Sequence, residues 1–364
     1  MRLSPTFSFY IGRQFLFWLA TVFLSLSVFI LVIDIVELLR RGGGRGDFTF
    51  FLGIEMALLK LPGTAQVVLP FSVLFASLAA FFRLTRYNEL VVARAAGVSA
   101  WQFLVPALFV VLVVGAFRVT TFNPFAATLL GKYEEMDRRY LRNDQSALIL
   151  AQDGIWLRES RADGQAIINA RSWDAERIRL SQIMIAEFDQ RDQFVRRLDA
   201  GWAELAAGEW TLHEVYVNEV SRVSSFEERL VYPTSLTIGE LENSLASPET
   251  VSFWDLLRYA DLLEGAGFPG QSMRLQWHAM IAEPALMCGM VLIAAGFAMR
   301  QVRRGGTMLV IGLGVMISFG LYVFSDIVHA LGLSARVPVE LAAWAPAAVV
   351  MLIGLTMLVH LEDG

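Results

Sequence analysis

The sequence is poor in cysteine, histidine and charge, and each shortage excludes a class of protein. A single cysteine, Cys288, cannot form an intramolecular disulfide. The four histidines are scattered along the chain and offer little to a metal ion. The net charge of -5 excludes a strongly basic nucleic-acid-binding protein. Only 18% of the 364 residues are charged and 55% are hydrophobic, which is too little polar surface for a soluble protein of this size.

Lysine is also scarce, since Lys60 and Lys132 are the only two in the chain. A nucleotide-binding P-loop needs a glycine, then lysine, then serine or threonine. Lys60 has no glycine before it, and Lys132 follows Gly131 but precedes Tyr133. The sequence also contains no H-E-x-x-H and no G-x-S-x-G motif. We therefore predict a chain that is not an enzyme, binds no cofactor or metal, and takes any energy it needs from a separate ATPase.

The charge that is present gathers in one part of the chain. The stretch 131–270 holds 15 basic and 25 acidic residues, net -10, whereas the two flanks together hold 15 basic and 10 acidic residues, net +5. A bilayer core of about 30 Å needs about 20 apolar residues in a helix. The flanks contain six such runs, three on each side of the polar stretch: 15–33, 65–82, 101–127, 277–299, 307–324 and 341–359.

This pattern predicts an α-helical membrane protein with six transmembrane helices and an inserted domain. The divisions are 1–130, 131–270 and 271–364. The first run is longer than the apolar part of a signal peptide and no cleavage site follows it, so we interpret it as a retained anchor. Eight Lys/Arg residues on the N-terminal side of the membrane against five on the other favour cytoplasmic termini. The inserted domain then lies outside the cytoplasm.

The insert has the composition of β-structure. Short stretches rich in Ile, Val, Leu, Trp and Tyr alternate with polar residues, as half-buried strands do. Asp-Gly pairs at 153–154 and 163–164 suit tight turns. We expect five to eight strands in a sandwich or an open barrel-like sheet, including 166–169, 178–188, 194–205, 210–220 and 229–238, followed by a helix over 253–267.

Four charged residues follow the first apolar run. Asp34 and Glu37 lie at its outer end, and Arg40 and Arg41 come directly after them. Charged side chains near a helix end either extend to the interface and pair locally or line a polar cavity. Both interpretations stay open from the sequence.

The loop between the second and third runs contains a short predicted helix. Asn88 is a suitable cap, Glu89 favours the positive end of the helix dipole, and Gly97 is a natural stop. Its apolar residues, such as Leu90 and Ala96, have no core of their own in a loop of this length. Docking into a groove on a cytoplasmic partner would bury them; a helix lying on the membrane surface is the alternative.

This segment, N-E-L-V-V-A-R-A-A-G-V-S, resembles the coupling helix of the LptF/LptG permeases, the membrane subunits of the lipopolysaccharide-export ABC transporter. Further similarities follow in the order of the family: Tyr10 to Arg13, Leu61-Pro62 with Leu69-Pro70, the stretch 317–322, and Val337-Pro338 with 342–346. The layout of three helices, insert and three helices is also that of the family. Asp153 to Arg158 resembles the segment that opens the β-domain of the LptG type rather than the LptF type.

The resemblance implies a periplasmic β-jellyroll for the insert and a place in the inner membrane of a Gram-negative bacterium. It implies that residues 87–98 form the coupling helix, in which Glu89 pairs with a basic residue of the ATPase and the rest of the docking helix comprises Leu90, Arg94, Ala96 and Gly97. ATP and Mg²⁺ would bind to that ATPase, an LptB dimer. The other implied partners are the paralogous permease, LptC with its transmembrane helix and jellyroll, and lipopolysaccharide as substrate, with no nucleic acid.

For the substrate cavity the resemblance implies Arg40 and Arg41, at positions that face lipid A phosphates. Arg118 and Lys132 are further candidates, and Asp34 with Glu37 lies beside them. The family has basic character deeper in its first helix, where this chain has Asp34. Alternatives are a permease for another envelope lipid or lipoprotein, which would carry its large domain after the first helix, a non-transporting structural bridge, and an intramembrane enzyme using Asp34, His278 and Glu283, for which no nucleophile–base spacing exists.

Overall fold

The computed structural model describes residues 5–43, 48–95, 97–142, 147–151, 154–161, 164–174, 179–191, 193–206, 209–219, 223–234, 247–265, 267–298, 307–334 and 336–363. It divides into two compact units. A helical unit comprises Met1–Glu134, Ser252–Trp254 and Arg274–Gly364. A second unit, built around a β-sheet, comprises Glu135–Val251 and Asp255–Met273. Each is described by itself.

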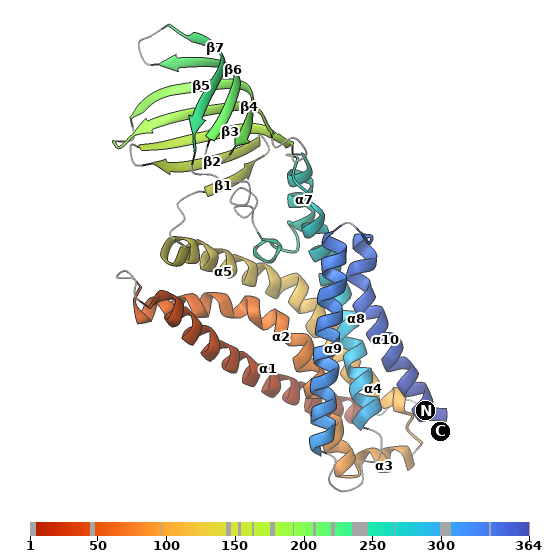
Figure 1. Cartoon of the computed structure of the whole chain (residues 1–364). Coiled ribbons are helices and arrows are strands. Elements are labelled where there is room, and N and C mark those ends of the chain that lie inside the picture. The colour runs from red at the N-terminus through yellow and green to blue at the C-terminus, as the bar shows by residue number, and fades with distance from the viewer. Residues whose placement is uncertain are drawn as a thin grey trace. The chain divides into compact units, whose positions relative to one another are not determined.

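Six helices are long and apolar enough to cross a membrane, which confirms the predicted set of three and three. Three precede the sheet in sequence and three follow it (Figure 1). A short helix joins the second and third. The elements are α1 Pro5–Gly42, α2 Phe50–Arg86, α3 Glu89–Ala95, α4 Ala100–Phe117, the π-helical turn η1 Arg118–Phe122, α5 Asn123–Met136, the π-helical turn η2 Asp137–Arg142, α8 Gln271–Ala298, α9 Thr307–Leu333 and α10 Val339–Asp363.

The first three spans are longer than their apolar runs. At about 1.5 Å per residue, the 37 residues of α2 reach about 55 Å, well beyond a hydrocarbon core of about 30 Å. The sequence interpretation counted Lys60 among the residues of the loop after the first span. The structure places it inside α2, since the helix begins at Phe50, where the Thr49 side chain caps the Leu52 amide. The second apolar run is therefore only the later part of a continuous helix.

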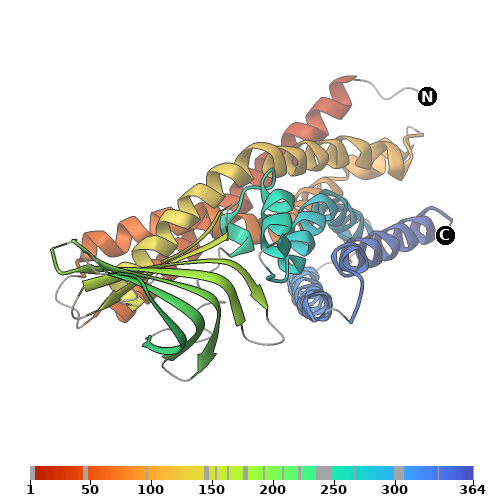
Figure 2. The same ribbon diagram turned by 90° about the horizontal axis from the view of Figure 1, so that it is seen from above.

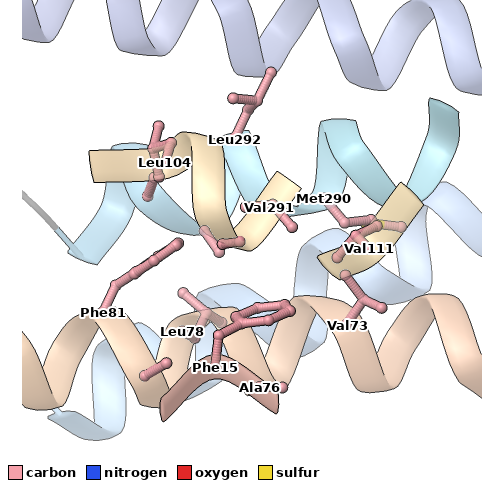
Figure 3. Packing of buried hydrophobic residues seen from close by; sticks show 14 of the residues in the cluster. Phe15, Val73, Ala76, Leu78, Phe81, Leu104, Val111, Met290, Val291 and Leu292 are labelled. Atoms are coloured by element: carbon pink, nitrogen blue, oxygen red, sulfur yellow. The ribbon is translucent and has the colours of Figure 1, made fainter. Parts of the chain in front are cut away.

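The core of the helical unit lies between α1, α2, α4 and α8. Phe15, Phe81 and Leu104 are each 2% exposed or less, and they belong to one cluster of buried apolar residues. Figure 3 shows side chains from these helices, including Phe15, Phe81, Leu104 and Val291, turned into the space between them. Such packing, rather than a hydrophobic driving force, holds helices together in lipid.

Glycines bring α8 and α10 into close contact. A Cβ atom added at Gly289 would lie 2.8 Å from Val350 Cγ1 and 2.9 Å from the Met351 backbone nitrogen. At Gly354 the added atom would lie 2.6 Å from Leu292 Cβ. Small residues that let two helix backbones approach are a common basis of helix association in membranes.

We expect Gly289→Leu to destabilise the helical unit by more than the usual cost of overpacking, which is about 1–3 kcal/mol, because the nearest atoms include backbone that cannot turn aside. Equilibrium unfolding of the purified protein in detergent measures this. Gly312→Leu in α9 is the matched control, because a Cβ there meets nothing within 4 Å. Equal stability of the two variants would contradict the close contact.

The second unit contains one antiparallel sheet of seven strands in the order β1-β2-β3-β4-β5-β6-β7, so every described strand pairs with its neighbour in sequence. This confirms the predicted inserted all-β, jellyroll-like fold and its open form. A helix, α7 Leu256–Gly265, follows the sheet. The strands are β1 Ala147–Ala151, β2 Gly154–Arg161, β3 Gly164–Asp174, β4 Arg179–Asp189, β5 Phe194–Ala206, β6 Glu209–Glu219 and β7 Ser225–Pro233.

The sheet is strongly curved, as Figure 2 shows. The register between β4 and β5 shifts between Glu187 and Phe188, and Gln182 and Glu214 have positive φ in mid-strand. Such irregularities increase the twist and bend of a strand. The curvature is large enough that Thr234, directly after β7, donates a hydrogen bond to Glu159 of β2 at 3.0 Å.

The inward face of the sheet is largely apolar, with polar residues such as Glu159 and Glu187 toward one end. Ile155, Ile168, Leu198 and Val215, from four different strands, are fully buried. At that end, the Glu187 carboxylate accepts a hydrogen bond from Arg196 and raises the pKa of that guanidinium. The predicted strand 229–238 corresponds to β7, which begins earlier, and residues 235–238 lie outside the described part of the chain.

Candidate functional site

The short helix α3 is fixed to the helical unit by its buried side. Leu90 is 5% exposed and belongs to the helical core, and Ala93 is buried as well. The hydroxyl of Tyr10, near the start of α1, donates a hydrogen bond to Glu89 Oε1 at 3.3 Å. By contrast Val92 is 67% exposed. Leu90 therefore anchors the helix, and the exposed side of α3 is the side that a partner can reach.

The ends of α3 are set by two residues with left-handed backbone. Asn88 has φ of 59° and begins the helix through its carbonyl oxygen, which accepts from Val92 N at 3.0 Å. The sequence predicted Asn88 as the cap of this helix. In the structure its left-handed backbone forms the turn between α2 and α3. Gly97 has φ of 83°, and Val98 N donates to Ala93 O at 3.1 Å, a bond typical of a glycine-terminated helix. Ala96 lies outside the described residues.

On α1 the four predicted charged residues fall into different settings. Glu37 and Arg40 form an ion pair at 2.8 Å within the helix, with Arg40 largely exposed. Arg41 is exposed in the last turn of the helix. Asp34 is only 8% exposed and pairs with Lys60 Nζ of α2 at 2.6 Å. Glu37 and Arg40 thus pair locally, whereas Asp34 forms a buried link between α1 and α2 that neither interpretation from the sequence had described.

A third helix joins that link. Lys60 Nζ lies 5.9 Å from the ring centre of Tyr133 on α5, a cation–π distance. Lys132, the neighbouring candidate, points to the exposed side of α5. The structure therefore brings Asp34 together with Lys60 and Tyr133. Of these three residues, Asp34 alone was a site candidate from the sequence.

Arg118 lines two cavities, but its charge is already paired. It is 9% exposed at the start of η1 and forms an ion pair with Glu283 of α8, whose side chain is 12% exposed. Its charge is compensated inside the helical unit, so it is not a free cation facing an anionic headgroup. Removing one of the two side chains would destabilise the helical unit, because the remaining buried charge would have no partner.

Two cavities flank Arg118. One, of about 210 Å³, is almost wholly apolar and lies between α1, α2 and the third span, where Leu19, Leu69 and Phe117 are among its lining residues. The other, of about 240 Å³, lies between α2, α8, α9 and α10. Its polar lining residues are Arg118, Gln276, Glu283, Tyr322, Ser325 and His329. Apolar walls with a few convergent polar groups are typical of sites for amphiphilic ligands.

Two helices leave much of their apolar surface uncovered. Phe17 and Phe29 on α1 are more than 60% exposed, and Met316 and Phe319 on α9 are more than 65% exposed. Within the described residues α1 and α9 are the least buried of the six spans. A lipid or another membrane protein must cover these faces.

The chain was compared with known protein families and curated proteins. The family model described as "Lipopolysaccharide export system permease LptF/LptG" matches residues 9–360. The lipopolysaccharide export system permease protein LptG of Escherichia coli K12 is 24% identical over 368 residues, covering 96% of this chain and 97% of that protein. LptG of Escherichia coli O6:H1 is similar to the same extent. The chain therefore belongs to the LptF/LptG family of lipopolysaccharide export system permeases.

Proposed function

We propose that this chain is an LptG-type permease subunit that draws lipopolysaccharide from the inner membrane and passes it to a periplasmic β-jellyroll bridge. The observation that carries the proposal is the family match over residues 9–360, with two LptG proteins among the relatives. The termini lie in the cytoplasm and the β-unit in the periplasm. The chain itself is not catalytic: a separate cytoplasmic ATPase, an LptB dimer, binds ATP and Mg²⁺.

The geometry of α3 supports a part in coupling. Leu90 fixes the helix to the core, so force applied to its exposed side reaches α1, through Tyr10, and α2, which it follows directly. Val92 supplies exposed apolar surface and Glu89 a carboxylate beside it. A rigid lever of this kind transmits a partner's movement as a rigid-body displacement.

The helical unit also has the surfaces that an amphiphilic lipid needs. An apolar cavity between α1 and α2 suits acyl chains, and Arg40 and Arg41 lie at the end of α1 where anionic groups would bind. The exposed faces of α1 and α9 suit lateral contact with the paralogous permease, LptF, and with the LptC helix. The apolar concave face of the sheet then accepts the acyl chains.

Co-purification with reconstitution tests the proposal. A tagged chain should bring down a cytoplasmic ATPase and a second six-helix permease, and vesicles containing the complex should release lipopolysaccharide only with ATP. Release of a lipoprotein or another lipid in its place would favour a different envelope permease. ATP-independent behaviour without an associated ATPase would favour a structural bridge.

Photo-crosslinking residues at positions 40 and 41 should capture lipopolysaccharide in the assembled complex. Both positions are exposed at the end of α1 and carry cationic side chains. Phe9, 71% exposed at the other end of the same helix, is the matched control. No capture at 40 and 41, beside capture at positions within the β-unit, would show that the arginines only extend to the interface.

A further inference from the structure

The first of the two π-helical turns in the third span makes contacts with a distant segment of the chain. Residues Arg118–Phe122 form a π-helical turn between α4 and α5. Such a turn departs from regular helical hydrogen bonding and is common at functional sites. Here the Thr120 carbonyl oxygen accepts a hydrogen bond from Trp254 Nε1 at 3.2 Å.

Trp254 belongs to Ser252–Trp254, a segment that lies within the polar stretch of the sequence but packs with the helical unit. It is fastened at a second point by Asn123, whose Oδ1 accepts from Phe253 N at 2.8 Å. The Nδ2 group of the same Asn123 side chain donates a hydrogen bond to Gln66 Oε1 of α2 at 3.3 Å. The Phe253 ring also stacks on Trp277 of α8, with ring centres 5.9 Å apart. The segment thus contacts η1, α5 and α8 at once.

One turn away, α4 and α8 cross at their closest point. A Cβ added at Gly115 would lie 2.9 Å from Met287 Cε and 3.0 Å from Pro284 Cβ. Beside this crossing Arg118 and Glu283 form their buried ion pair. The crossing is therefore fixed by close packing on one side and by a compensated charge pair on the other.

Glu283 also borders the cavity between α2, α8, α9 and α10. Ser325 and His329 of α9 line the same space. The cavity of about 240 Å³ thus has α9 on one side and the contact between α4 and α8 on the other.

We propose that Arg118 and Glu283 are positioning residues for the transport reaction. Their ion pair holds α4 and α8 together as one rigid body. The segment Phe253–Trp254 is attached to this body through η1 and Asn123. The segment and the cavity wall beside α9 therefore move together. Both side chains border a cavity of the helical unit, but the role assigned to them acts through the contact between α4 and α8. The inference rests on the proposed function.

The test compares charge variants in the reconstituted complex. Arg118→Glu and Glu283→Arg, each alone, should lower the amount of lipopolysaccharide released per ATP hydrolysed at least tenfold, and the double variant should restore it to within threefold of wild type. Arg258→Asp, in an exposed pair with Asp255, is the matched control and should leave the ratio unchanged. A purely structural pair would reduce the yield of complex but not this ratio in the molecules that assemble.

If the single charge variants do not assemble, a milder variant still tests the proposal. Trp254→Phe removes the indole N–H that reaches Thr120 and keeps a smaller aromatic ring, and it should lower release per ATP severalfold with unchanged ATPase activity. An unchanged ratio in Trp254→Phe, or a double charge variant no better than the singles, overturns the proposal. Failure of the proposed function is distinguishable, because the wild-type complex itself would then release no lipopolysaccharide.

Discussion

Glu89→Lys is expected to abolish ATP-driven transport while leaving the chain folded in the membrane. The helix α3 is held by Leu90 in the core, not by the carboxylate, so reversing the charge should not detach it. A lysine at this position still reaches the Tyr10 hydroxyl, which now accepts a hydrogen bond in place of donating one. The defect should therefore appear in coupling to the ATPase rather than in folding.

The expected size follows from the cost of disrupting a buried charge pair at an interface, about 2–5 kcal/mol. Because each tenfold change in affinity corresponds to about 1.4 kcal/mol, the affinity of this chain for the ATPase should fall by about 30-fold to several thousand-fold. Transport in vesicles and retention of the ATPase during purification both measure it.

Glu89→Gln is the matched control, because it keeps an acceptor for Tyr10 and removes only the charge. It should lose less activity than the lysine variant. An acidic residue introduced at the facing basic position of the ATPase should partly restore the lysine variant. Wild-type transport by Glu89→Lys would rule out the coupling role of this residue.

The second large effect is expected at the buried ion pair. Glu283→Ala leaves the Arg118 guanidinium buried without its carboxylate, and it should lower the free energy of unfolding by about 3–5 kcal/mol. Desolvation explains the size: Arg118 is 9% exposed, so its guanidinium has little contact with water to replace the lost carboxylate. Equilibrium unfolding in detergent measures the change.

The double variant Arg118→Met with Glu283→Met separates the pair's charge from its volume. Replacing a buried pair by apolar side chains is often neutral or stabilising, so this variant should recover most of the stability lost in Glu283→Ala. The exposed pair of Arg258 and Asp255 serves for comparison, since removing Asp255 should cost less than about 1 kcal/mol. A Glu283→Ala protein as stable as wild type would show that the pair is open to water.

The architecture was predictable because each part of it depends on local composition. Twenty apolar residues in succession specify a span wherever they occur, and alternation such as that of residues 211–217 specifies a strand of the sheet, here β6. The three-and-three arrangement and the β-insert were therefore predicted correctly. The ends of the helices were not, because Glu55 and Lys60 interrupt the apolar stretch over which α2 continues.

The pairings within the site could not be predicted from the sequence. Arg118 and Glu283 are 165 positions apart, and Asp34 finds Lys60 on the neighbouring helix only because of the angular position of both residues about their axes. Arg118 and Glu283 were each named from the sequence as candidates, but no sequence pattern relates the two positions. Leu90 likewise looked uncovered, because its covering residues come from distant parts of the chain.

If the chain removes a lipid from a bilayer as proposed, the excess length of α1 and α2 changes the barrier to that step. Exposing a methylene group to water costs about 0.8 kcal/mol, so an acyl chain of a dozen carbons costs on the order of 10 kcal/mol if it leaves in one step. Beyond the hydrocarbon depth these helices still present apolar side chains, among them Val36, Phe50 and Phe51, each at least 58% exposed. A chain that slides along them exchanges one apolar contact for the next, which divides a single high barrier into several low ones.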